Sequence, residues 1–100
     1  MEAQLRIYTV KPGELDEWIA EWSQEVAPLR RRFGFHVLGP WVDEETRTFV
    51  WVLEYDGEDG FAAADARYYG SDERRALDPD PARHLEAIET RLLRRVDAPE

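Results

Sequence analysis

Cysteine is absent from this sequence of 100 residues, so the chain can form no disulfide, no thiolate zinc site and no cysteine nucleophile. No apolar run approaches the length of about 18 residues that crosses a membrane. The first residues also lack the cationic and apolar regions of a signal peptide. Lysine occurs once, as Lys11, among 13 basic residues, and this arginine bias is typical of GC-rich bacterial genomes. We therefore expect a bacterial, cytoplasmic protein.

Positive charge is in short supply, because 13 basic residues face 22 acidic ones for a net charge of −9. Such a chain repels phosphate backbones and anionic lipids, which argues against nucleic-acid and membrane partners. The two basic clusters, Arg30–Arg32 and Arg94–Arg95, are expected on the solvated surface. With 43% hydrophobic residues, residues 1–100 have the composition of a single globular domain.

The first part of the chain shows a strand pattern and then a helix pattern. Residues 4–10 are rich in branched and aromatic side chains and predict a strand, which Pro12 and Gly13 end. The apolar face of an amphipathic helix follows, at Leu15, Trp18, Ile19, Trp22 and Val26. Pro28 is expected to interrupt this helix or to start a short successor, which Gly34 ends.

A hairpin is predicted next. Residues 35–42 form its first strand, with a bulge or a sheet edge at Gly39–Pro40, and residues 48–55 form its second. The second strand is almost continuously apolar, so we expect both of its faces to be buried. An alanine-rich helix over 58–69 follows, and Ser71 has the position of an N-cap for a short helical turn.

The last segment fits two patterns. Leu85, Ile88 and Leu92 have helical spacing, and most residues around them are good helix formers. A strand over 87–96, preceded by a helical turn over 82–86, would instead complete a four-stranded antiparallel sheet in the order β-α-β-β-α-β. We predict the strand, and with it an α+β fold of the ferredoxin-like class.

Two helices can cover only one face of such a sheet, whereas the strand over 48–55 is apolar on both faces. An open face with Trp and Val side chains would be a large exposed apolar patch. The simplest cover is the same face of a second copy, so we predict a symmetric homodimer in which two sheets close on each other. The alternative is a monomer whose aromatic side chains all belong to one core.

Several motifs resemble the NIPSNAP family. Residues 8–18, Tyr-Thr-Val-Lys-Pro-Gly-Glu-Leu-Asp-Glu-Trp, are similar to its N-terminal signature of a strand, Lys-Pro-Gly and a helix opening with Leu-Asp-Glu and an aromatic residue. Further similar segments are Gly34-Phe35, Gly39-Pro40-Trp41, Phe49-Val50-Trp51 with Tyr55, and Ser71-Asp72-Glu73-Arg74. The resemblance covers most of the chain and implies the dimeric α/β-barrel superfamily. Its members include cofactor-independent monooxygenases, muconolactone-type isomerases, polyketide cyclases, haem-degrading enzymes and chlorite dismutases. No motif of the haem-using branches can be carried over, so we predict no cofactor.

His36 and His84 are the two histidines, and a histidine can transfer a proton near neutral pH. His36 lies among apolar residues of the second strand, where a pocket between sheet and helices would reach it, and we take it as the candidate catalytic residue. The alternative is a core or interface histidine. His84 lies in a polar segment and is expected to be exposed. The two have no companions at ligand spacing, so no metal site is predicted, although haem held by a single histidine stays open.

The candidate substrate-binding residues are mostly aromatic, because a buried tyrosine offers a flat apolar body and one hydroxyl to a phenolic or polyketide-like substrate. We predict this set to be Tyr8, Trp51, Phe61, Tyr68 and Arg74. Core packing is the alternative for each aromatic residue. Arg6 or Arg74 would bind a carboxylate or an enolate, with ion pairs to Glu54 and Glu89 as the structural alternative.

Two classes of function remain. The first is a small-molecule enzyme that binds a hydrophobic, oxygenated substrate between sheet and helices and performs cofactor-independent oxygenation, isomerisation or cyclisation. The second is a non-catalytic ligand-binding or dimerisation module. The second is favoured by the lack of a Ser-His-Asp arrangement, a P-loop or a dinucleotide-binding fingerprint in the sequence.

Overall fold

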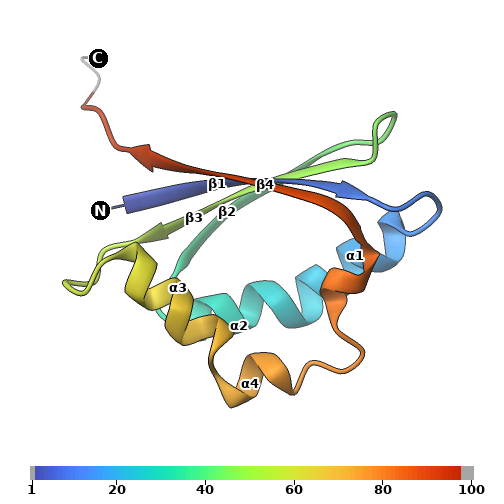
Figure 1. Cartoon of the computed structure of the whole chain (residues 1–100). Coiled ribbons are helices and arrows are strands. Elements are labelled where there is room, and N and C mark those ends of the chain that lie inside the picture. The colour runs from blue at the N-terminus through green and yellow to red at the C-terminus, as the bar shows by residue number, and fades with distance from the viewer. Residues whose placement is uncertain (1, 98–100) are drawn as a thin grey trace.

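The computed structural model describes residues 2–97 and has one antiparallel sheet with all its helices on one face (Figure 1). The strands are β1 (Glu2–Val10), β2 (His36–Asp43), β3 (Thr48–Tyr55) and β4 (Leu85–Arg94), in the sheet order β2-β3-β1-β4. The helical segments are α1 (Leu15–Glu21), η1 (Trp22–Val26), α2 (Ala27–Arg32), α3 (Phe61–Tyr69), α4 (Asp72–Arg75) and η2 (Pro81–His84). This four-stranded arrangement confirms the prediction of a ferredoxin-like α+β fold.

The segments α1, η1 and α2 follow one another without a break, and Pro28 explains the change between them. Proline has no N–H to donate, and Pro28 lies in the first turn of α2. Just before it the backbone is π-helical, and the N–H of Ala27 donates to the carbonyl of Trp22. The predicted short successor after this interruption is therefore confirmed. It ends at Arg32, and Gly34, whose φ is 91°, turns the chain away two residues later.

The second helical part differs slightly from the prediction. α3 begins at Phe61, not at residue 58, because Gly60 has a φ of 85° and cannot belong to a right-handed helix. Ser71 caps α4 as predicted, since its Oγ accepts a hydrogen bond from the N–H of Arg74 at 3.0 Å. None of the helices within residues 2–97 is long and apolar enough to cross a membrane.

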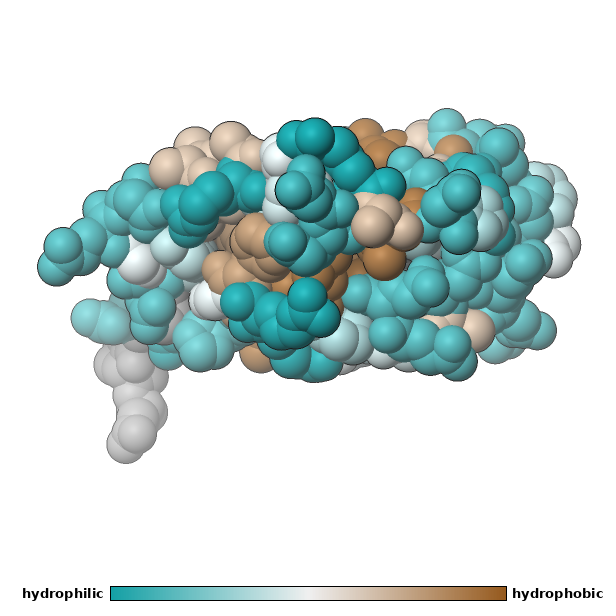
Figure 2. Space-filling model, turned by 90° about the horizontal axis from the view of Figure 1, so that it is seen from below, coloured by the Kyte–Doolittle hydropathy of each residue, from teal (hydrophilic) through white to brown (hydrophobic). Residues whose placement is uncertain are grey.

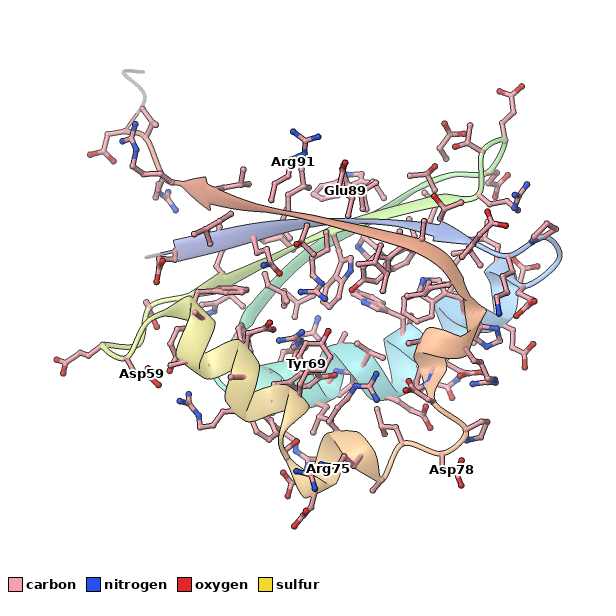
Figure 3. The ribbon with its side chains drawn as sticks, viewed as in Figure 1. Asp59, Tyr69, Arg75, Asp78, Glu89 and Arg91 are labelled. Carbon is pink, nitrogen blue, oxygen red and sulfur yellow. The ribbon has the colours of Figure 1, made fainter. Side chains whose placement is uncertain are left out.

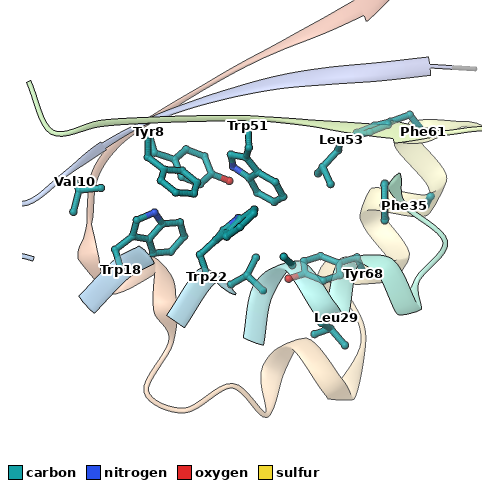
Figure 4. Close-up of a cluster of buried hydrophobic side chains, with 14 residues drawn as sticks. Tyr8, Val10, Trp18, Trp22, Leu29, Phe35, Trp51, Leu53, Phe61 and Tyr68 are labelled. Atoms are coloured by element: carbon teal, nitrogen blue, oxygen red, sulfur yellow. The ribbon is translucent and has the colours of Figure 1, made fainter. Parts of the chain in front are cut away.

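The core between sheet and helices is rich in aromatic rings (Figure 4). β3 contributes Phe49, Trp51 and Leu53, all buried. The ring of Trp22 meets two of them edge-on, with centroids 5.3 Å from Phe49 and 5.4 Å from Trp51. Such pairs contribute about 0.5–1.5 kcal/mol each beyond their burial.

The two edges of the sheet are β2 and β4. The register between β2 and β3 shifts between Leu38 and Trp41, so the bulge and the edge expected at Gly39–Pro40 are both present. β4 pairs with β1 from Glu2 to Val10, which confirms the strand at the end of the chain. It begins two residues earlier than predicted. Pairing satisfies the backbone groups along β1, and this outweighs the helix propensity of the segment.

The sheet face away from the helices, which we name the outer face, is not covered by any part of residues 2–97. Its side chains include Leu5, Ile7, Leu38, Trp41, Val50, Val52, Glu89, Arg91 and Leu93. Figure 3 shows Glu89 and Arg91 pointing away from the helical layer. In a single chain only the inner face of β3 is buried, because Val50 and Val52 on the outer face are half-buried. Burial of both faces of β3 stays a prediction, since it needs the second copy.

Candidate functional site

A cavity of about 110 Å³ lies between the sheet and the helices. Its aromatic wall comes from four elements and consists of Tyr8, Trp18, Trp51, Tyr68 and Tyr69. Two arginines, one valine from η1 and the apolar side chains of η2 and early β4 complete the lining. From the helix side, hydrophobic residues form a patch surrounded by hydrophilic ones (Figure 2).

The structure brings together four of the five predicted substrate-binding residues at this cavity: Tyr8, Trp51, Tyr68 and Arg74. Phe61 is not among its lining residues. It lies in the core, with its ring centroid 5.5 Å from that of Phe35. The helical spacing from Phe61 to Tyr68 therefore places both on the buried side of α3, but only Tyr68 reaches the cavity.

Arg6 does not line the cavity itself. Strand alternation nevertheless puts its side chain on the same face of β1 as that of Tyr8, which does line the cavity. Its side chain is buried, at 5% exposure. Nε donates to the hydroxyl of Tyr8 at 2.7 Å, and Nη2 donates to the hydroxyl of Tyr69 at 2.8 Å. Nη1 donates to the side-chain carbonyl of Gln4. All three acceptors are neutral oxygens.

The predicted ion pairs of Arg6 or Arg74 with Glu54 or Glu89 are wrong. Both carboxylates lie on the outer face, where Glu54 approaches Arg95 at 3.7 Å and Glu89 approaches Arg91 at 3.3 Å. Within residues 2–97, Arg6 forms no salt bridge. A buried guanidinium without a carboxylate is costly, since its charge has left water without meeting an opposite charge.

Tyr8 and Tyr68 are both protonated at neutral pH. Burial raises the pKa of Tyr8 above its ordinary value, although the adjacent Arg6 guanidinium opposes this rise. Burial likewise raises the pKa of Tyr68, against the opposing charge of Arg30. Each phenol therefore retains a proton that it can donate.

The cavity wall also carries donors that the protein itself leaves unused. Across the part of the chain that the structure describes, the Tyr68 hydroxyl and the indole N–H groups of Trp18 and Trp51 are buried and have no hydrogen-bond partner. Leaving such a group unpaired costs about 1–3 kcal/mol. The cavity wall therefore contains unpaired donors, which an acceptor oxygen that reaches them would satisfy.

Two further arginines at the cavity have carboxylate partners. Arg30 is 1% exposed, pairs with Asp65 at 2.7 Å and stacks over the Tyr68 ring at 3.7 Å from its centroid. The prediction that Arg30 belongs to a solvated cluster is wrong, and its spacing of four residues from Val26 was the signal that it continues the buried helical stripe. Arg74 pairs with Asp80 at 2.9 Å near the surface.

His84 is buried at 2% exposure, so the expectation that it is exposed is wrong. Its Nδ1 lies 2.8 Å from Glu14 Oε1, and its Nε2 lies 2.9 Å from Glu21 Oε2. Burial lowers the pKa of His84, but the hydrogen bonds with Glu21 and Glu14 outweigh it and raise the pKa above its ordinary value. Glu17, Glu21 and His84 offer ligand atoms within 4.8 Å of one another, yet both ring nitrogens already face carboxylates. The arrangement is that of an imidazolium held between two acids.

His36 does not lie between sheet and helices, and that expectation is wrong. It pairs with Glu54 in the β2–β3 register, which puts its side chain on the outer face. The ring is 59% exposed and lies 3.9 Å from Asp56. It does not line the cavity, so its predicted catalytic role is not one that it can play there.

A four-stranded antiparallel sheet with helices on one face places the protein in the ferredoxin-like α+β class. The chain belongs to the NIPSNAP family, whose family model matches residues 2–99. No curated protein matches the sequence.

Solved structures share this fold at low sequence identity. An uncharacterised NIPSNAP domain protein from Burkholderia xenovorans is 20% identical, with a TM-score of 0.83 and 100% of both chains covered. A NIPSNAP family protein from Agrobacterium tumefaciens is 18% identical, with a TM-score of 0.83 over 96% of this chain and 93% of the other. A structure described as an antibiotic biosynthesis monooxygenase is 18% identical, with a TM-score of 0.72 over 97% of this chain and 100% of the other. At these identities the likeness establishes the fold alone.

Proposed function

We propose that this protein binds a small, hydrophobic, oxygen-bearing molecule in the cavity between sheet and helices. The observation that carries this proposal is the Tyr68 hydroxyl, which is buried in an aromatic wall without a partner among the described residues. Aromatic rings supply a large apolar contact area, and a few converging polar groups orient a ligand. A ligand oxygen would satisfy the hydroxyl.

The chemistry that we propose is cofactor-independent oxygenation, isomerisation or cyclisation. Each of these reactions proceeds through a species with developing charge on oxygen, which hydrogen-bond donors in a dry site stabilise. The donors at Tyr8, Tyr68 and Trp51 support this assignment. The monooxygenase of similar fold is consistent with it but does not specify a substrate.

We also propose that the protein is a homodimer joined through its outer faces. Trp41 is 59% exposed and Leu38 is 42% exposed on this face. The face also carries both an acid and a base, Glu89 and Arg91, so it can match a copy of itself around a twofold axis.

A cytoplasmic location completes the proposal, and cell fractionation tests it.

Native mass spectrometry of the protein purified under non-denaturing conditions tests ligand and assembly together. We expect a mass of two chains, with an added mass that disappears on denaturation. The Tyr68→Phe variant should keep the dimer and lose most of that added mass. A single-chain mass at micromolar concentration would contradict the dimer.

The alternative function is a non-catalytic ligand-binding or dimerisation module. A second experiment distinguishes this module from an enzyme. The released molecule is identified and incubated with the protein in air, and its conversion is followed by chromatography. Turnover supports the enzyme, whereas an unchanged ligand that binds stoichiometrically supports the binding module.

A further inference from the structure

The hydrogen bonds of Arg6 resemble those that an arginine makes with a carboxylate. Nε and Nη2 are adjacent donors on one edge of the guanidinium, the edge with which arginine commonly holds the two oxygens of a carboxylate. Here they hold two phenol oxygens, those of Tyr8 and Tyr69, at 2.7 and 2.8 Å. The two hydroxyls are therefore brought side by side by one cation.

The direction of these hydrogen bonds decides what the hydroxyls can do next. A guanidinium only donates, so each phenol oxygen acts as an acceptor toward Arg6 and keeps its own proton for another partner. For residues 2–97, neither hydroxyl has an acceptor on another residue. Tyr8 and Tyr69 both line the cavity, and Tyr69 lies between α3 and the sheet in Figure 3.

The charged side chains around the cavity leave one positive charge without a carboxylate partner. Asp65 already pairs with Arg30, and Asp80 already pairs with Arg74. The guanidinium of Arg6 has no such partner in the described residues. An anion that accepts hydrogen bonds from the two phenols would compensate the buried charge of Arg6 through the intervening hydroxyl groups, without touching the guanidinium.

We propose that Tyr8 and Tyr69, polarised by Arg6, form an oxyanion site for a small molecule whose negative charge is shared between oxygen atoms, a carboxylate or an enolate. This inference rests on the proposed function, because it assigns the polar end of the ligand in the same cavity. Tyr8 and Tyr69 contact the ligand. Arg6 is a positioning residue, which orients the two hydroxyls and strengthens them as donors.

Four probes test the charge requirement. Benzoate is compared with neutral benzamide, and cyclohexane-1,3-dione, which is largely an enolate at neutral pH, is compared with neutral cyclohexanone. Binding is followed by calorimetry and by the fluorescence of Trp18 and Trp51 in the cavity wall. We expect each anion to bind about tenfold or more tightly than its neutral analogue, as hydrogen bonds to charged groups imply. Preference for benzoate alone assigns carboxylates, and preference for the dione alone assigns enolates.

The variants Tyr69→Phe and Tyr8→Phe should remove most of this preference while neutral probes bind as before. Arg6→Lys keeps the charge but not the paired donors, so it should also reduce the preference. Tyr55→Phe is the matched control, since the Tyr55 hydroxyl donates to Asp59 at 2.7 Å and lies outside the cavity lining. Tyr69 is 44% exposed, so its variant tests the inference even where a buried substitution prevents folding.

Failure of the oxyanion site and failure of the proposed ligand cavity give different results. Equal binding of anions and neutral analogues by the unmodified protein would overturn the oxyanion site and leave the proposed ligand cavity intact. An anion preference that survives Tyr69→Phe and Tyr8→Phe would also overturn it. Failure of all four probes to bind would instead overturn the proposed function from which the inference starts.

Discussion

Nε2 of His84 lies 2.9 Å from Oε2 of Glu21, and this contact ties the residue just before β4 to helix α1. The second ring nitrogen faces Glu14, and Arg83 donates to both oxygens of Glu21 at 2.8 Å. The start of the last strand is thus held to the first helix by a small network of charges. Pro81, Ala82 and Leu85 of the same segment line the cavity, so the network also positions one cavity wall.

This network should make stability depend on pH. Because the folded pKa of His84 is raised, its stabilising contribution is complete below the unfolded pKa of about 6.5 and is lost as pH rises through the folded value. The pKa of Glu21 is lowered, chiefly by its hydrogen bond with Arg83, so its contribution is lost in acid. We expect the melting temperature to fall as pH rises above about 6.5.

Thermal unfolding of His84→Gln between mildly acidic and alkaline pH checks this dependence. The variant should be less stable at mildly acidic pH, by on the order of 2 kcal/mol, and should lose the decline above neutral pH. His36→Gln is the matched control, because the His36 ring is 59% exposed in a single chain and has no hydrogen bond among the described residues, so the decline should stay in place. An unchanged pH profile in His84→Gln would mean that the imidazolium does not stabilise the fold.

Tyr68→Phe should separate stability from binding. The Tyr68 hydroxyl has no partner among residues 2–97, so its removal should leave the free energy of unfolding equal or raise it by about 1 kcal/mol. Binding of the cavity ligand should weaken. Tyr55→Phe removes the hydrogen bond that Tyr55 donates to Asp59, so it should slightly lower the free energy of unfolding. Urea titration measures both, and a clear loss of stability in Tyr68→Phe would show that the hydroxyl already has a structural partner.

The Arg30–Asp65 pair should behave as a buried ion pair. Asp65→Asn leaves the Arg30 charge buried without its counter-charge and should cost about 2–3 kcal/mol. The double variant Arg30→Met with Asp65→Asn should recover part of this loss, because no unpaired charge remains. A double-mutant cycle in urea gives the coupling. Strict additivity of the single variants would contradict the pairing.

Trp41→Glu should weaken the proposed dimer without unfolding the chain. Trp41 is 59% exposed in a single chain, whereas a buried glutamate at a dimer interface is strongly disfavoured. Light scattering across a dilution series should show dissociation at a higher concentration than for the unmodified protein. Arg75→Glu on α4, exposed on the helix side, makes a larger charge change, of two units against one, and should still leave the dimer intact. Equal behaviour of the two variants would place the interface elsewhere.

The order of elements was determined by local sequence. The alternation in residues 4–10, the apolar run in residues 48–55, the four-residue repeat of Trp18, Trp22 and Val26, and Pro28 are all local signals, so each was readable without the fold. The identity of β4 was readable only through consistency with the other three strands. Tyr8, Trp51 and Tyr68 were also predicted to line a pocket, because large aromatic side chains on strands and helices tend to face a core. Arg74, predicted as an anion-binding residue, lines the same cavity.

Only the tertiary structure decided which side each charged residue occupies. His36 lies on the outer face because of its register with Glu54, and a shift of one residue would reverse its side. Arg6, Arg30 and His84 are buried because distant partners receive them: Tyr69 for Arg6, Asp65 for Arg30, and Glu14 with Glu21 for His84. A sequence states which residues can ionise, but the free energy of burying a charge depends on partners that folding alone brings within hydrogen-bond distance.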